Sequence, residues 1–133
     1  MAHPKEERTL VLIKPDGVIR GLVGEVISRF EKRGLKIIAL KMVWPTSEHI
    51  DKHYPSHNEW FSSVGARTSE FFKNKNIDVK EHFGTENAAE IGKQVKSWLA
   101  DYMTSGPVVA IAVEGMHAIT AVRKLVGHTY PIE

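Results

Sequence analysis

The chain has 133 residues and a mass of 15.0 kDa, a length that one domain with one hydrophobic core accounts for. Its 42% hydrophobic and 26% charged residues exclude a disordered chain, since disorder needs few apolar residues and a high net charge. The absence of cysteine excludes disulfide scaffolds, thiol catalysis and Cys-ligated zinc, and is consistent with a cytoplasmic location. No apolar stretch has the length of a membrane span, and segment 1–7 lacks the pattern of a signal peptide.

The positive charge is concentrated in the first third of the chain. Residues 1–45 carry nine Lys/Arg and five Asp/Glu, a net charge of 9 − 5 = +4, whereas the whole chain carries only +2. A mildly basic segment can bind phosphate or nucleic acid, or it can simply be a solvated surface. Charge alone leaves both interpretations open.

The first third predicts a strand, a helix and a second strand. After a polar tail over 1–8, the aliphatic run 10–13 predicts a strand that ends in a Pro-x-Gly turn at 14–17. Apolar residues at 23, 26, 27 and 30 follow helical spacing, and Gly34 stands where helices end. Residues 35–43 predict the second strand.

The middle of the chain predicts three helices: a short one from Ser47 to about residue 54, a second over 59–76, and a third that begins at Asn87 with Glu90 in a capping-box arrangement. The positions expected to be buried in the second and third helices are Trp60, Phe61, Val64, Phe71, Phe72, Ile91, Val95, Trp98, Leu99 and Tyr102.

The last third predicts an apolar strand over 107–113, central in a sheet, and a helix after Gly115 with Ile119, Val122 and Val126 on its buried face. The order β-α-β-(α-α-α)-β-α indicates an α/β sandwich of the ferredoxin-like split β-α-β type, with an antiparallel sheet, whose sixth element is missing. We therefore expect a single domain over 1–133, incomplete at its C-terminus for want of a closing strand, with a helical insertion over 62–101.

Five residues could carry chemistry. Lys14 ends a strand and presents a compact charge to an anion, unless it belongs to a plain surface turn. Arg123 and Thr129 suit phosphate oxygens, although Arg123 alone reads as a surface charge. Tyr54 and Trp60 could stack on a base, or they could belong to the core.

Two further patterns point away from special chemistry. Gly21 and Gly24 form a Gly-x-x-Gly pair that clamps nucleic-acid backbone in some modules, but close helix packing explains it better. His49, His53 and His57 are spaced i, i+4, i+8, yet Pro55 interrupts that helix, so we expect no metal site there.

Four stretches nevertheless resemble one family over nearly the whole chain. They read ERTLVLIKPDGVIRGLVGEVISRFEKRGLKIIALKM (7–42), HYPSHNEWF (53–61), YMTSGPVVAIAVEG (102–115) and VRKLVGHTYP (122–131). These stretches are similar to nucleoside diphosphate kinases, in a long form with extra helices after Trp60.

The resemblance implies a ferredoxin-like α/β sandwich and an enzyme that moves the γ-phosphate of a nucleoside triphosphate onto a nucleoside diphosphate through a phosphohistidine. It implies Mg²⁺ bound with the nucleotide, little preference for the base, assembly as a homo-oligomer, and a location in the cytoplasm. It makes a nucleic-acid or membrane partner unexpected.

Matched position by position, the resemblance implies that Lys14 contacts the ribose hydroxyl and the terminal phosphates, and that Arg123 and Thr129 hold the β-phosphate region. It places Tyr54 near the nucleophile and Trp60 on the base. Tyr130 departs from the asparagine common at its position.

The resemblance assigns no catalytic residue within these 133 residues, because none of the seven histidines aligns with the nucleophile. We expect the nucleophile beyond Glu133, in a longer polypeptide, and expect the segment alone to be inactive. Two alternatives stay open: a nucleotide- or nucleic-acid-binding paralogue without catalysis, and a structural or regulatory paralogue.

Overall fold

The structure is a computed structural model that describes residues 4–129, and its contacts divide the chain into two units. The sheet unit comprises 4–44 and 107–129, and the helical unit comprises 45–106. The helical unit thus contains the predicted insertion and extends beyond it at both ends.

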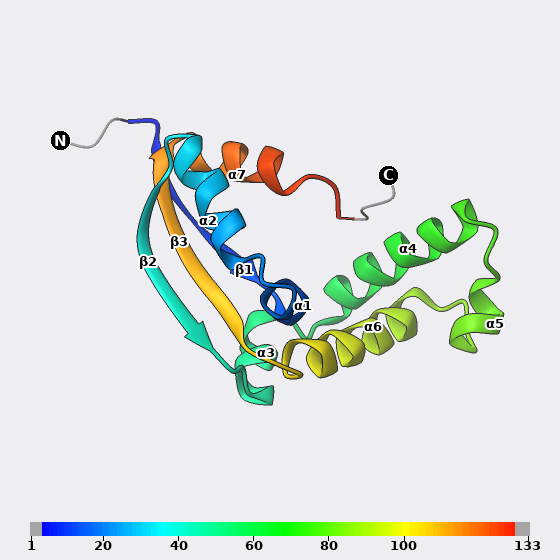
Figure 1. Cartoon of the computed structure of the whole chain (residues 1–133). Helices are drawn as coiled ribbons and strands as arrows, with labels where there is room; N and C mark the ends of the chain where they lie inside the picture. The colour runs from blue at the N-terminus through cyan, green and yellow to red at the C-terminus, as the bar shows by residue number, and fades with distance from the viewer. Residues whose placement is uncertain (1–3, 130–133) are drawn as a thin grey trace. The chain divides into compact units, whose positions relative to one another are not determined.

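The sheet unit contains an antiparallel sheet with helices on one face (Figure 1). The strand order is β1-β3-β2, so the last strand in sequence lies in the centre, as its apolar run predicts. The elements are β1 (Glu6–Ile13), α1 (Pro15–Ile19), α2 (Val23–Lys32), β2 (Lys36–Val43), β3 (Val108–Met116) and α7 (Ala118–Val126).

The core of the sheet unit follows the twofold alternation of β3. Val109, Ile111 and Val113 are buried on the face that the helices cover. Phe30 of α2, 2% exposed, and Val122 of α7 belong to the same cluster. These contacts hold the two helices against the sheet and thereby fix where their ends lie.

Strand β2 forms an edge of this sheet within the part of the chain that the structure describes. Its sequence continues into Trp44, and large apolar side chains along this edge are exposed: Ile38, Leu40, Met42 and Trp44. An exposed apolar edge strand favours association with another chain.

The helical unit is built around two long helices that run side by side, α4 (Asn58–Asn74) and α6 (Ala88–Met103) (Figure 1). A Cβ atom built on Gly65 would lie 1.7 Å from the Ala88 carbonyl oxygen, and one built on Gly92 would lie 2.0 Å from the Phe61 carbonyl oxygen. The two backbones therefore cross in direct contact, which only glycine permits.

Two short helices complete the helical unit, α3 (Ser47–His53) before α4 and α5 (Val79–Phe83) between α4 and α6. Phe83 of α5 stacks on Trp98 of α6 with ring centroids 5.5 Å apart, and it also contacts Phe72 of α4. Val79, Phe83 and Ile91 form a small separate core. Among residues 4–129 no helix has the length and apolarity needed to cross a membrane.

The structure confirms the predicted strands, the helix from Val23 and the three helices predicted in the middle of the chain. It corrects the ends of several elements. Segment 14–17 is not a simple turn: Pro15 opens the short helix α1, a position that suits its fixed φ. Strand β1 begins at Glu6, so residues 6–8 of the predicted polar tail belong to the sheet. Its main chain pairs with β3 as far as Met116, because strand pairing uses backbone groups and does not depend on polar or apolar side chains.

Four helices, and not three, lie between β2 and β3. The missed helix α5 is only five residues long, and its apolar pattern is a single i, i+4 pair, Val79 and Phe83. Its signals were local: the Asp78 carboxylate accepts a hydrogen bond from the Glu81 N–H at 2.9 Å, and Gly84 ends the helix in the left-handed conformation.

Two predicted buried faces are wrong in part. Strand β3 continues to Met116, so α7 starts later and buries Ala118 and Val122, while Ile119 and Val126 are about half exposed. Trp98 is 47% exposed, because it covers the outer side of Phe83.

The capping box predicted at the start of α6 is only half formed. Asn87 caps the helix as expected, accepting a hydrogen bond from the Glu90 N–H. The Glu90 carboxylate does not return the bond and instead accepts one from the Thr85 hydroxyl at 2.8 Å.

Gly65→Ala should destabilise the helical unit, because the new methyl group would overlap the Ala88 carbonyl and force α4 and α6 apart. We expect a loss of about 1–3 kcal/mol in the free energy of unfolding, measured by urea denaturation with tryptophan fluorescence. Gly24→Ala is the matched control, since nothing lies within 4 Å of its Cβ position in α2. An unchanged midpoint for Gly65→Ala would contradict the close crossing.

Candidate functional site

Tyr54 and Trp60 form an aromatic pair in the helical unit. Their ring centroids are 6.1 Å apart with an interplanar angle of 45°, and both side chains are half-buried. The ring of His53 meets Tyr54 edge-on at 4.8 Å. Half-buried aromatic rings keep a surface on which a planar ligand can stack.

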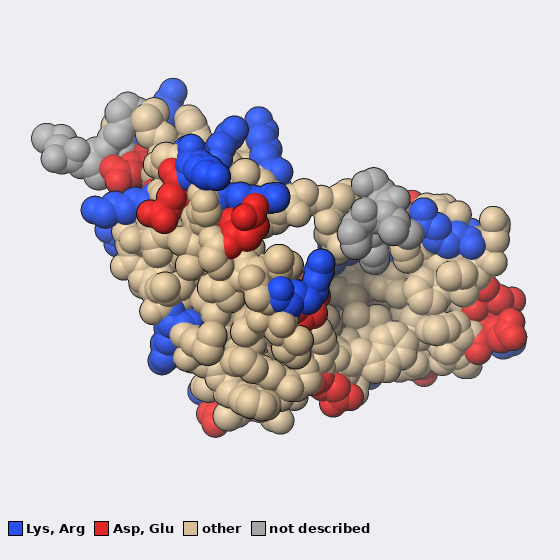
Figure 2. Space-filling view, viewed as in Figure 1, with Lys and Arg blue, Asp and Glu red and all other residues tan. Residues whose placement is uncertain are grey.

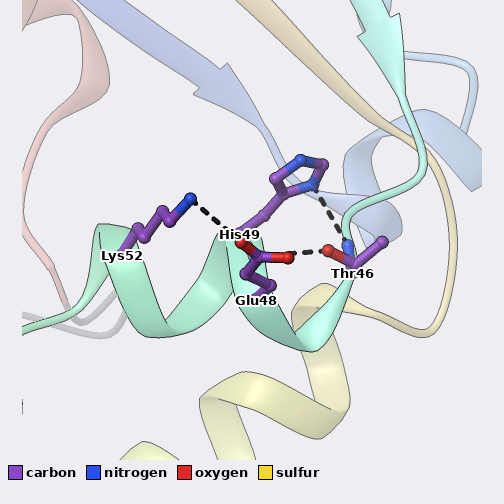
Figure 3. Close-up of polar contacts among 4 residues, drawn as sticks. All are labelled: Thr46, Glu48, His49 and Lys52. Carbon is purple, nitrogen blue, oxygen red and sulfur yellow. Dashed lines mark hydrogen bonds and ion pairs between the residues drawn. The ribbon is translucent and has the colours of Figure 1, made fainter.

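Helix α3 positions Tyr54. A reciprocal capping box starts the helix: the His49 N–H donates to the Thr46 hydroxyl at 3.3 Å, and the Thr46 N–H donates to His49 Nδ1 at 3.2 Å (Figure 3). Ile50 is buried, and its carbonyl accepts the hydrogen bond of the Tyr54 N–H at 2.9 Å. Tyr54 therefore stands at a fixed helix end.

Trp60 lies in the first turn of α4, and its backbone N–H donates to Nδ1 of the capping residue His57 at 3.2 Å. The neighbouring Phe61 is buried, and the Trp60 ring meets it edge-on at 5.7 Å. Phe61 thus takes the core position at this end of the helix, and Trp60 remains half-buried beside it.

Burial raises the pKa of the Tyr54 phenol above its usual value of about 10. The phenol therefore stays protonated at neutral pH, and its hydroxyl can donate a hydrogen bond there.

The three polar candidates belong to the sheet unit. Lys14 is exposed at the end of β1, where its carbonyl accepts the Val18 N–H at 3.1 Å and begins α1. Arg123 is exposed in the last turn of α7, and exposed Thr129 follows the end of that helix.

The topology places Lys14 beside the start of β3 and packs α7 against β1 and α2. Ile13 pairs with Val109 near the start of β3, which runs antiparallel to β1, and α7 then returns along β1. The end of α7 consequently lies beside the start of α2, where Leu22 and Val126 line a common groove. Lysine, arginine and threonine side chains suit an anionic ligand, and the convergence of these three on one ligand stays a prediction.

The groove between α2 and α7 has a volume of about 260 Å³ and is mainly apolar. It contains none of the five predicted site residues; its lining consists of Leu22, Glu25, Val26, Arg29, Phe30, Leu125 and Val126.

Lysine and arginine side chains gather over α2, with carboxylates between them (Figure 2). Arg29 Nε lies 2.8 Å from Glu25 Oε1, and this contact lowers the pKa of the Glu25 carboxyl. The basic character of the first third is thus partly paired within the helix, which favours a solvated surface over a polyanion-binding one.

The three spaced histidines do not share a helix face, because α3 ends at His53 and the chain turns through Pro55 as predicted. Among the described residues no three His, Asp or Glu side chains gather in a way that could hold a metal ion. His49 and His57 instead cap α3 and α4. Sequence reasoning missed this role, although each stands three residues from its capping partner.

Tyr130 lies outside the described residues. Tyr54 and Trp60 belong to one unit, and Lys14, Arg123 and Thr129 to the other, so their action on a common ligand stays a prediction.

The family model described as "Nucleoside diphosphate kinase" matches residues 7–74 and 67–133 of the chain. The nucleoside diphosphate kinase of Pyrobaculum aerophilum is 50% identical over 125 residues, which cover 94% of this chain and 68% of that protein. The nucleoside diphosphate kinase of Pyrococcus abyssi is 44% identical over 131 residues, covering 98% of this chain and 62% of the relative.

Solved structures show the same likeness. The crystal structure of an NDP kinase from Pyrobaculum aerophilum matches with a TM-score of 0.89 and 48% identity, over 95% of this chain and 69% of that one. A transition state mimic of the nucleoside-diphosphate kinase from Borrelia burgdorferi, with bound vanadate and ADP, matches with a TM-score of 0.68 and 33% identity, over 97% of this chain and 60% of that one.

The sheet with its two covering helices defines a protein of the ferredoxin-like α/β class. The chain belongs to the nucleoside diphosphate kinase family. It spans about two thirds of the length of the relatives that it matches, 68% of one and 62% of the other.

Proposed function

We propose that the protein to which this chain belongs is a nucleoside diphosphate kinase, a phosphotransferase that moves the γ-phosphate of a nucleoside triphosphate to a nucleoside diphosphate. The observation that most directly supports this proposal is the 50% identity to the nucleoside diphosphate kinase of Pyrobaculum aerophilum over 94% of the chain. The substrates are nucleoside tri- and diphosphates, and Mg²⁺ enters with the phosphates that it neutralises.

The proposed reaction has two halves. A histidine expected beyond Glu133 attacks the γ-phosphorus of the triphosphate, the bond to the β-phosphate oxygen breaks, and the diphosphate leaves. The phosphohistidine then gives its phosphoryl group to the second nucleoside diphosphate. The residues of this chain bind and orient the nucleotide in both halves.

The intact protein should take up ³²P on one histidine from γ-labelled ATP and pass it to GDP, whereas the 133-residue chain alone should take up none. The reason is that this chain supplies binding groups without an aligned nucleophile. Acid-labile, base-stable label measured after gel filtration decides the point. Label on the 133-residue chain would place the nucleophile within it, and an intact protein that binds ATP without labelling would be the non-catalytic paralogue.

Within this function, we propose that Trp60 stacks on the base while Lys14, Arg123 and Thr129 contact the phosphates. The half-buried Trp60 ring and the exposed cations of the sheet unit support these roles. Tyr54, whose phenol stays protonated, would lie near the nucleophile. Stacking tolerates any base, because every base has a π-face.

Trp60→Ala should weaken the binding of ADP, GDP and CDP by similar factors, since a stacking contact is worth about 1–3 kcal/mol for any base. Arg123→Ala should weaken nucleotide binding and leave nucleosides nearly unaffected, because its partner is phosphate. Isothermal titration calorimetry on the intact protein measures both. A Trp60→Ala variant that is less stable but binds every nucleotide normally would make Trp60 a core residue.

We also propose that the protein is a cytoplasmic homo-oligomer. The exposed apolar side chains along β2 support association with a second copy, whose own β2 would present the same surface about a twofold axis. The absence of cysteine supports the reducing compartment.

We propose that segment 62–101 is an insertion that covers the nucleotide site as a lid. Its helices α4, α5 and α6 form a packed unit with its own core, and an element of this kind can change its order when a ligand binds.

ADP should slow amide hydrogen exchange in segment 62–101 of the intact protein, because a lid loses openings when it closes on a ligand. Exchange is followed by mass spectrometry with and without ADP, at two protein concentrations. Protection that depends on protein concentration and ignores ADP would overturn the lid and identify the segment as an oligomer contact.

A further inference from the structure

Each aromatic residue of the candidate site adjoins a helix whose start includes a histidine that accepts a hydrogen bond. Nδ1 of His49 accepts the Thr46 N–H at the start of α3, the helix that ends at Tyr54. Nδ1 of His57 accepts the Trp60 N–H at the start of α4. Only an unprotonated ring nitrogen can accept a hydrogen bond, so both rings are neutral in this arrangement.

We propose that His57 is a positioning residue for base binding: its neutral imidazole caps α4 and holds Trp60 toward the base, and protonation releases it. The inference rests on the proposed stacking role of Trp60. His57 itself touches no reacting atom; it acts through the backbone of Trp60.

The geometry makes the cap specific to Trp60. The Trp60 N–H is one of the first four amides of α4, which have no carbonyl partner within the helix, and His57 Nδ1 is the acceptor that it finds. The next amide, that of Phe61, is already bonded to the His57 carbonyl at 3.1 Å. The Phe61 bond closes the first turn of α4, and the imidazole supplies the further bond that holds the Trp60 amide within this turn.

Protonation acts on this turn in two ways. The imidazolium carries N–H donors on both nitrogens, so the bond from the Trp60 N–H is lost. Its positive charge also lies at the helix N-terminus, where the backbone dipoles disfavour a cation. Protonation of the imidazole should therefore release the Trp60 amide from its cap, while the backbone bond of Phe61 is unaffected.

Charged groups surround this turn from each packed helix. Helix α6 contributes Lys96, whose ammonium binds the Ser56 hydroxyl and lies 3.7 Å from Asp51 Oδ1, and Lys93, which lies 5.9 Å from the centre of the Phe61 ring. The titratable and charged residues connected to this turn by these contacts or by their place in the sequence are Asp51, His53, Glu59, Lys93 and Lys96. His53 is the second histidine of this set, and it requires its own control.

The substitution that tests the idea keeps the cap and removes the titration. Asparagine is a preferred N-cap residue whose side-chain oxygen accepts the same hydrogen bond at any pH. His57→Asn should bind ADP within twofold of the parent protein at pH 8. His57→Ala removes the acceptor and should bind ADP about fivefold more weakly at pH 8, because binding must then order the uncapped helix end, and losing an N-cap costs helix stability of about this size.

The pH profile separates positioning from mere stability. Between pH 8 and pH 5.5, the ADP affinity of the intact parent protein should fall about fivefold more than the ADP affinity of His57→Asn. The ADP affinity of His53→Asn should fall by the same factor as that of the parent. Comparing variants cancels the titration of the ADP phosphates themselves. Equal pH profiles for the parent and His57→Asn, or unchanged ADP binding by His57→Ala at pH 8, would overturn the inference.

A measurement without nucleotide tests the His57 cap independently of the proposed function. In ¹⁵N–¹H spectra the Trp60 amide should shift with pH in the parent protein and stay constant in His57→Asn. An amide that ignores the substitution would refute the cap itself. If instead the amide titrates as expected while Trp60→Ala binds ADP normally, the stacking role in the proposed function is wrong, and His57 no longer positions a base-binding residue.

Discussion

The pairing of β3 with both of its neighbours is the constraint on which the sheet unit depends. Strand β3 bonds to β1 on one edge and β2 on the other, so its main-chain donors and acceptors are used on both sides. Its residues Ile111 and Val113 are completely buried, which ties both covering helices to this strand. Because β1 and α7 are both packed against β3, this strand fixes where Lys14 and Arg123 stand within the sheet unit.

The helical unit obeys a different constraint, the direct contact of two backbones. Gly65 and Gly92 let α4 and α6 approach until main-chain atoms touch, so the unit is held by close packing in addition to its small aromatic core. This rigidity differs from the behaviour of an unstructured loop. It also explains how a short connecting helix such as α5, which has little stability alone, is retained: Phe83 fills the space between α4 and α6.

Local hydrogen bonds set the candidate aromatic site within this rigid frame. Tyr54 ends one short helix and Trp60 begins the next, so neither side chain lies in the middle of a long element that would fix it by packing alone. The capping bonds of His49 and His57 therefore carry more of the ordering than they would elsewhere. An imidazole accepts such a bond only through an unprotonated ring nitrogen, whereas a hydroxyl or amide oxygen has no such requirement.

The sequence by itself determined the family, the order of the long elements and the central place of β3, because these depend on apolar periodicity and on motifs that stand contiguously in the chain. It also determined the break at Pro55, since proline acts through its own backbone. Tertiary structure alone decided the rest. The partial exposure of Trp60 beside the buried Phe61, the exposure of Ile119, the start of β1 at Glu6 and the contact through Gly65 each depend on partners far away in sequence. A side chain's own neighbours along the chain do not say which distant backbone will cover it.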